Sequence, residues 1–260
     1  MTFSIRETPR ERRTASRACA RQVLGMGPNR LALVLAGIAC ATVSFLSFFL
    51  PQIGVSAVYQ WLGKSMDEMS FGAWCLLQLL TLFLFWILAM PLWLGMYRMA
   101  IDMMDGRANG KAFFHYAEGV RGYGRALAIS ARLIPRWLPA MVGYLVMITF
   151  FDLDLVGLLV VVAFAITLVL SVLWAGGLGG FVTLAVTNDE APLYRIKKQS
   201  LRLLEGERIG DFCFHFGMVW RVLVSLAFAG LPLLLHTLPH AMLSSVCYVR
   251  RLSARDGVDF

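Results

Sequence analysis

Histidine is the residue type whose spacing in this chain comes nearest to a chemical site. His236 and His240 are four residues apart, a spacing that places two metal ligands on one face of a helix. Pro239 lies between them and no carboxylate is near in sequence, so a position near the outer membrane interface is favoured over metal binding. His115 and His215 have no cysteine or acidic partner at a spacing that would complete a site. The sequence therefore predicts no metal ligands and no cofactor.

Hydrolytic and phosphate-transfer motifs are missing from the sequence. No G-x-S-x-G, H-E-x-x-H or Walker loop appears in the apolar runs, and neither does a paired acidic cluster. A hydrolase needs a nucleophile with a base, or a set of metal ligands. The acidic residues are instead expected in loops, termini and helix ends. The chain is therefore predicted not to be an enzyme, and no catalytic residue is assigned.

A basic helix from Pro192 to Glu205 is the main candidate for binding chemistry. Its apolar face comprises Leu193, Ile196, Ser200, Leu203 and Leu204. Its cations lie largely around that face and are Arg195, Lys197, Lys198 and Arg202. Asp189 is expected to cap the start, and Gly206 to adopt the left-handed conformation at the end. Such a helix is predicted to lie on the inner leaflet of a membrane, where its cations contact anionic lipid headgroups.

Arg221 is a further candidate for contact with lipid or substrate, because it lies in an otherwise apolar stretch about ten residues after Asp211. An unpaired arginine at mid-bilayer costs from about 2.5 kcal/mol on insertion scales to far more in simulations. Its side chain is therefore expected to face the interior of a helix bundle or a wet cavity. Snorkelling to the membrane surface is the alternative, and it needs a strong tilt or a later start to the span.

The elements that position these candidate residues are predicted to be membrane helices, and the clearest sign is the uncharged stretch from Leu155 to Asn188. As one helix, its roughly 34 residues would reach about 50 Å, beyond the hydrocarbon core of about 30 Å. The interruption is expected at four glycines, which are Gly176, Gly177, Gly179 and Gly180. Gly176 and Gly180 have GxxxG spacing, which favours close helix packing over a hinge beside a binding site.

The composition is that of a membrane protein. Hydrophobic residues make up 58% of the chain and charged residues 15%, and the mean hydropathy is +0.68. In soluble domains, hydrophobic residues make up about 45–50% and charged residues about 25%. The prediction is an all-α polytopic bundle of about six transmembrane helices with interfacial amphipathic helices. The six predicted spans are Leu31–Leu50, Gly72–Met96, Ala126–Phe151, Leu155–Trp174, Phe212–Phe228 and Leu233–Val249. Pro51 is expected to close the first span, and Pro91 to kink the second.

The positions of the cations predict the topology. All lysines and arginines except Lys64 and Arg221 fall in segments assigned to the cytoplasmic side, as the positive-inside rule requires. The chain is therefore placed in the bacterial cytoplasmic (inner) membrane as a multi-pass protein with both termini in the cytoplasm. Its predicted parts are a basic N-terminal segment (1–30), a membrane domain (31–251) and a tail (252–260).

The net charge of +8 points to anionic lipid headgroups rather than nucleic acid, because the cations flank apolar runs. In the N-terminal segment, Arg13, Arg17 and Arg21 recur every four residues and predict a short basic helix along the membrane surface, broken at Gly25 to Pro28. The five cysteines have no paired spacing and are interpreted as small hydrophobic residues rather than a disulfide framework: Cys19, Cys40, Cys75, Cys213 and Cys247.

An internal repeat is suggested by a shift of 84 residues. The shift pairs Leu94-Gly95 with Leu178-Gly179, Asp105 with Asp189, and Gly122 with Gly206. Around these pairs the order of features is also shared: span end, acidic turn, basic amphipathic helix, glycine, new span. The predicted unit is an amphipathic helix followed by a two-span hairpin, present three times.

Residues 186–206 begin with V-T-N-D-E-A-P and end with I-K-K-Q-S-L-R-L-L-E-G. They resemble a segment of certain bacterial integral membrane proteins of unknown function. There a short acidic turn leads to an A-[IL]-K-x-S-x-x-L-x-x-G helix, and the broad group includes the membrane domain of glycerophosphodiester phosphodiesterases. The resemblance implies a six-helix membrane fold and supplies no catalytic residue. It departs from the family at Arg221, where the family tends to be apolar.

Two functions are consistent with these patterns. The favoured one is a non-enzymatic integral membrane protein that binds lipid or partner proteins, since basic amphipathic helices accompany mostly uncharged spans. The alternative is a small-molecule or lipid transporter, since repeats and broken spans are frequent in transporters. The sequence leaves a protein partner or a homo-oligomer open.

Overall fold

The computed structural model of the chain describes residues 7–65, 68–107, 110–135, 138–139, 142–143, 146, 155–174, 178–207, 209–217 and 236–256. Over these ranges the chain forms helices joined by turns and no strand, which confirms the all-α prediction. The chain divides into two compact units. The first unit is Met26–Leu127, and the second combines Met1–Gly25 with Ala128–Phe260.

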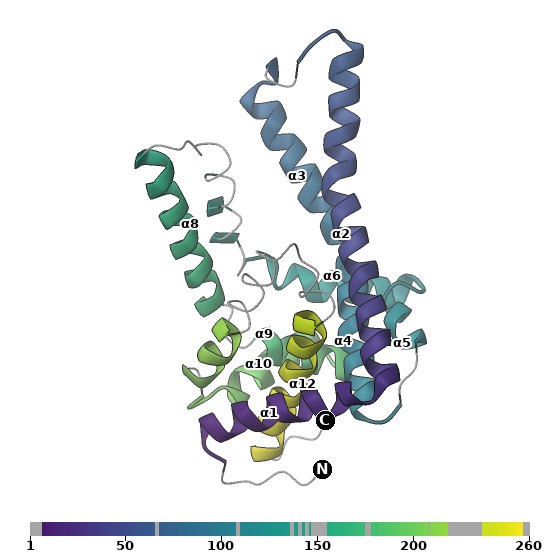
Figure 1. Cartoon of the computed structure of the whole chain (residues 1–260), viewed down its shortest axis with the longest axis vertical. Coiled ribbons are helices and arrows are strands. Elements are labelled where there is room, and N and C mark those ends of the chain that lie inside the picture. Colours follow the sequence, from purple (N-terminus) through teal and green to yellow (C-terminus); the bar gives the residue numbers. More distant parts are fainter. Residues whose placement is uncertain are drawn as a thin grey trace. The chain divides into compact units, whose positions relative to one another are not determined.

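The first unit is built on helix α2 (Gly27–Trp61), which packs beside α3 (Phe71–Leu88) (Figure 1). Pro28 lies in the first turn of α2, where a missing backbone N–H costs no helical hydrogen bond. The predicted end of the first span at Leu50 is wrong, because Pro51 lies inside α2 and the helix continues to Trp61. An internal proline removes a single backbone donor, and the uncharged sequence after it otherwise sustains the helix.

A short break separates α3 from α4 (Met90–Met104), close to the kink that was predicted at Pro91. The break falls at Ala89, and Pro91 then occupies the first turn of α4, a position that suits its fixed φ angle. Helix α4 extends beyond the predicted span end at Met96. At the start of α3, the hydroxyl of Ser70 accepts a hydrogen bond from the backbone N–H of Ala73, 3.3 Å away.

Helices α5 (Lys111–Phe114) and α6 (Val120–Ala131) complete the first unit, although α6 continues past its boundary at Leu127. Helix α4 packs closely on α5, because a Cβ atom added at Gly95 would lie 1.8 Å from the carbonyl oxygen of Phe113. The Tyr123 hydroxyl of α6 donates a 2.7 Å hydrogen bond to the carbonyl oxygen of Ile87. The indole of Trp93 donates to the Ser44 hydroxyl at 3.2 Å, which joins α4 to α2.

Among the described residues, two helical segments are long and apolar enough to cross a membrane by length and composition. They are α2, with 35 residues, and the segment Phe71–Met104 formed by α3 and α4, with 34 residues. Of the most apolar 18 residues of each, 33% and 22% are buried. Most residues of these segments are therefore not fully buried in the protein.

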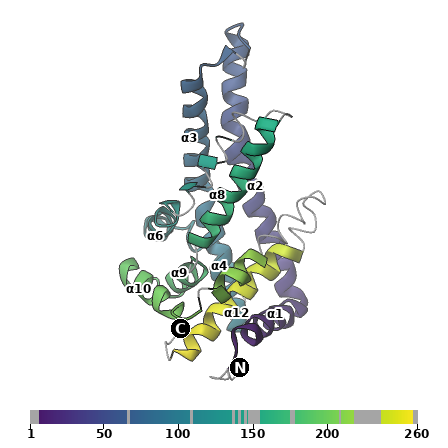
Figure 2. The same cartoon turned by 90° about the vertical axis from the view of Figure 1, so that its left-hand side faces the viewer.

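The second unit is centred on α12 (Leu238–Arg255), which packs along α1 (Pro9–Gly25) (Figures 1 and 2). The predicted N-terminal helix and its break at Gly25 are confirmed. Helix α1 starts with a capping box that the sequence analysis missed. The backbone N–H of Thr8 donates to the Glu11 carboxylate at 2.8 Å, and the backbone N–H of Glu11 donates to the Thr8 hydroxyl at 3.3 Å.

Helices α8 (Leu155–Trp174), α9 (Leu178–Thr187) and α10 (Leu193–Leu203) also belong to this unit. Helix α8 has the bounds of the predicted fourth span. Helix α9 packs against α10 and α12. Residues 209–217 are also helical. The last span was predicted to end near Val249, but the helix itself, α12, continues to Arg255. In this extension, Arg251 pairs with Glu7 and Arg255 with Asp256.

Several predictions fall outside the described residues. They concern Arg221, Gly176, Gly177, most of the third span after residue 135 and the fifth span beyond residue 217. Gly179 and Gly180 lie in α9, and a Cβ atom added at buried Gly180 would be 3.8 Å from the Ser200 Cβ atom of α10. Gly180 is thus one point of ordinary packing contact between these two helices.

The ends of α10 decide two further predictions. Gly206 has φ +80°, which confirms the expected left-handed residue after the helix. Asp189 does not cap the helix, because Pro192 occupies that position and no side chain accepts a capping hydrogen bond. Gly122, which the 84-residue shift pairs with Gly206, lies inside α6 and has no positive φ. The two glycines therefore differ in backbone conformation.

Candidate anion-binding pocket

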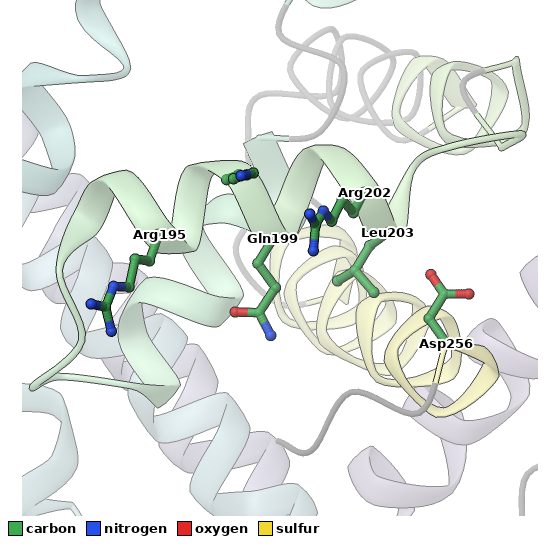
Figure 3. A pocket seen from close by; sticks show the side chains of 6 residues that line it. Arg195, Gln199, Arg202, Leu203 and Asp256 are labelled. Carbon is green, nitrogen blue, oxygen red and sulfur yellow. The ribbon is translucent and has the colours of Figure 1, made fainter.

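A pocket of about 450 Å³ lies between α10 and the end of α12 (Figure 3). Its volume is in the range of small-molecule sites. Arg195, Gln199 and Arg202 come from α10, and Asp256 follows the last residue of α12 (Figure 3). The complete lining is Arg195, Lys198, Gln199, Arg202, Leu203 and Asp256. Three of the four cations singled out in the sequence of this helix therefore line one pocket.

The amphipathic pattern of α10 explains why these cations face outward. Leu193, Ile196, Ser200 and Leu203 are buried, as the sequence predicted, and the helix packs on α9. The cations on the opposite side are exposed. Because protein covers the apolar face, that face is not available to enter a bilayer. Any binding of lipid by α10 must proceed through its charged side.

The carboxylate of Asp256 is occupied by its neighbour Arg255. The Arg255 Nε atom lies 2.5 Å from Oδ1, and Nη2 lies 2.9 Å from Oδ2, a two-point contact that also raises the pKa of Arg255. The same Nη2 atom donates to the carbonyl oxygen of Leu203 at 3.0 Å. Arg255 thus neutralises the one acidic side chain in the lining and ties the end of α12 to the end of α10.

The three cations of the lining have no such partner. Within the part of the chain that the structure describes, Lys198 and Arg202 form no ion pair. Arg195 bonds the hydroxyl of its neighbour Tyr194 at 3.1 Å and lies 5.8 Å from that ring's centroid. The pocket therefore carries unbalanced positive charge, and guanidinium groups together with an ammonium group suit a phosphate or carboxylate ligand.

A buried ion pair holds the elements that frame the pocket. Arg12 Nη1 of α1 lies 2.6 Å from Glu207 Oε1, with side chains 4% and 6% exposed. Arg255 Nη1 reaches the same oxygen at 3.5 Å, and Arg251 pairs with Glu7 at 2.5 Å. These contacts join α1, the turn after α10 and the end of α12. Sequence reasoning missed them because the partners are 195 residues apart for Arg12 and Glu207 and 244 for Arg251 and Glu7.

The remaining sequence candidates lie elsewhere. Lys197 is exposed and does not line the pocket. The rings of His236 and His240 are 6.0 Å apart between centroids, and no group of three or more potential ligands gathers among the described residues. His215 does have an acidic partner, contrary to the sequence analysis, since its Nδ1 atom lies 3.2 Å from Asp211 Oδ1. Their spacing of four residues could have revealed this pair.

No relative supplies a function for this pocket. Comparison of the chain with protein-family models, with characterised proteins and with solved structures finds no match. Its chemistry must therefore be inferred from its own charges and geometry.

Proposed function

We propose that the chain is a non-enzymatic integral membrane protein that binds anionic lipid headgroups in the pocket formed by Arg195, Lys198 and Arg202. The observation that carries the proposal is the charge imbalance of this pocket. Three cations line it without ion-pair partners among the described residues, while Arg255 holds its one carboxylate. A lipid phosphate accepts several charge-assisted hydrogen bonds at once and supplies the missing negative charge.

Exposed apolar helices support the membrane part of the proposal. The core helix of a soluble protein would have most of its apolar side chains buried, whereas 33% and 22% are buried in the two segments able to cross a bilayer. Large apolar side chains lie exposed along α2 and α3, among them Leu35, Phe45, Phe49, Leu76 and Leu80. Contact with lipid tails would cover them.

The finer topology belongs to the same proposal. The chain crosses the bacterial inner membrane six times with both termini in the cytoplasm, and α10 lies at the inner surface. The positive-inside charge pattern supports this placement. The resemblance of residues 186–206 to bacterial six-helix membrane proteins agrees with it, and so does the repeated order of features along the chain. A partner protein or a second copy of the chain remains compatible with it.

Lipid retention tests the function. The protein would be purified in its native lipids as wild type and as the triple variant Arg195→Gln, Lys198→Gln and Arg202→Gln, and its bound lipids identified by mass spectrometry. Each cation contributes about 1 kcal/mol against an anionic surface, so the triple variant should bind anionic lipid about 100-fold more weakly. Neutral lipid should be unchanged. Lys197→Gln, which removes an exposed cation outside the pocket, is the control. Wild-type retention of anionic lipid by the triple variant would refute the proposal.

Transport of a lipid or small molecule is the second candidate. Arg221 favours it, because a cation in an apolar stretch suits an anionic group that moves through the membrane. The same purification separates the two functions. Under transport, Arg221→Leu lowers the content of bound anionic lipid more than Arg202→Leu does. Under headgroup binding at α10, the order of the two effects is reversed.

A further inference from the structure

Two cysteines that are far apart in sequence meet between α1 and α12. The Sγ atoms of Cys19 and Cys247 are 2.7 Å apart, and the residues are 5% and 0% exposed. The separation in sequence is 228 residues. None of the other three cysteines, all in the described part of the chain, contacts another cysteine sulfur. Only the fold therefore creates this pair, and cysteine spacing could not reveal it.

The surrounding contacts hold the two sulfur atoms in place. Ala20 and Val23 of α1 are buried beside Cys19 in the sequence, and Leu243 and Val246 of α12 are buried before Cys247. At the other end of α1, the Glu7–Arg251 contact fastens the residues just before α1 to α12, and the buried Arg12–Glu207 contact fastens α1 to the turn after α10. A disulfide has an S–S bond of about 2.05 Å, so its formation requires movement of only a few tenths of an ångström by each sulfur.

The environment of Cys19 favours its reaction as a thiolate. The Cys247 thiol donates a hydrogen bond to the Cys19 sulfur, and the positive charges of Arg251 and Arg250 add to this effect. Together they lower the pKa of Cys19 below that of an ordinary cysteine, although burial opposes the shift. The thiolate is the nucleophilic form of cysteine, so the lowered pKa favours Cys19 as the attacking thiol. Cys247 is then positioned as the second thiol.

We propose that Cys19 and Cys247 form a disulfide when the protein meets a peroxide, and so lock α1 to α12. The Cys19 thiolate attacks one oxygen of hydrogen peroxide, the O–O bond breaks, and the products are a sulfenic acid and a hydroxide that takes up a proton to become water. The Cys247 sulfur then attacks the sulfenic sulfur. The S–S bond forms, the S–O bond breaks, and the departing hydroxide takes the Cys247 proton to give a second water. Two thiols are oxidised and one peroxide is reduced to two waters.

The resting state is the dithiol wherever the compartment is reducing. With the N-terminus and the C-terminal end of α12 on the cytoplasmic side, as proposed above, cellular reductants keep the pair reduced until oxidant is present. The disulfide would close a loop of more than 200 residues, which strongly restricts the unfolded chain. Oxidation should therefore raise the thermal midpoint by at least about 5 °C. This effect does not depend on whether the pocket binds lipid.

The experiment uses the full chain in native lipids. The folded protein is treated with hydrogen peroxide, denatured, alkylated and digested, and its peptides are identified by mass spectrometry with and without reductant. A peptide pair joining Cys19 to Cys247 should appear, disappear on reduction, and form faster at pH 8 than at pH 6. Cys213→Ser, which removes an exposed cysteine elsewhere, should leave the link intact. Cys19→Ser should abolish it.

The wild-type protein alone can overturn the proposal, so the result does not depend on a variant that folds. If Cys19 and Cys247 both remain open to alkylation after peroxide treatment, they do not form the disulfide. A link between any other two cysteines, with none between this pair, would equally refute the proposal. Formation of the link without a rise in the thermal midpoint would contradict the lock between α1 and α12.

Discussion

Glu207→Gln is expected to lower the free energy of unfolding by about 3–5 kcal/mol, because it leaves the buried guanidinium of Arg12 without its carboxylate. Both side chains are almost wholly removed from solvent, so water cannot replace the lost charge. Arg255, 3.5 Å from the same carboxylate oxygen, loses a partner as well. In a chain of this size the thermal midpoint should fall by about 10 °C.

Thermal unfolding of the lipid-bound protein measures this effect, with Glu205→Gln as the matched control. Glu205 is exposed two residues before Glu207 in the same turn, so its neutralisation should change stability by less than about 0.5 kcal/mol. A double variant, Arg12→Leu with Glu207→Leu, should recover much of the loss because it leaves no unpaired charge at the centre of the contact. Equal effects of Glu207→Gln and Glu205→Gln would show that the buried ion pair does not hold α1 to the rest of its unit.

Gly95→Ala is expected to be the most damaging conservative change in the first unit. The added Cβ atom would lie 1.8 Å from the carbonyl oxygen of Phe113, well inside the distance at which two such atoms can approach. The obstacle is backbone, so no side-chain rotation relieves it, and α4 must move away from α5. Overpacking of this kind lowers the free energy of unfolding by about 1–3 kcal/mol. Because the obstacle is backbone, we expect a loss of about 3 kcal/mol or more.

Gly124→Ala is the matched control for this change. Gly124 also lies inside a helix, α6, but nothing stands within 4 Å of the Cβ atom it would gain. Alanine there should stabilise the protein by about 0.5–1 kcal/mol, because glycine has the greater conformational freedom when unfolded. Thermal unfolding of the two variants should thus shift in opposite directions. If both alanines raise the thermal midpoint, α4 and α5 are not in close backbone contact.

Local pattern was sufficient to predict several elements. The buried face of α10 follows from the spacing of Leu193, Ile196, Ser200 and Leu203, because helical periodicity is a property of neighbouring residues. The bounds of α8 follow in the same way from the uncharged run before the glycines. The left-handed conformation of Gly206 was also predictable, since glycine after a basic amphipathic helix is a frequent C-terminal signal.

Contacts between distant segments could not be predicted from local pattern. Nothing near Arg12 in the sequence identifies Glu207 as its partner, and the same holds for Cys19 and Cys247. Pro51 was misjudged because a proline weakens a helix without necessarily ending it. The pocket was found in part: the cations of α10 were evident, but the contribution of Asp256 and its neutralisation by Arg255 depend on the tertiary fold.

The location of the pocket relative to the membrane is the central claim that remains to be measured. Lipid headgroups of the anionic inner leaflet can reach Arg195, Lys198 and Arg202 only if α10 and the C-terminal end of α12 lie on the cytoplasmic side. Two reporters would be fused in turn at the C-terminus and near Lys64, a fluorescent protein that folds in the cytoplasm and a phosphatase active in the periplasm. The predicted result is fluorescence at the C-terminus and phosphatase activity near Lys64. Phosphatase activity from the C-terminal fusion would place the pocket on the wrong side of the membrane and contradict headgroup binding at the inner leaflet.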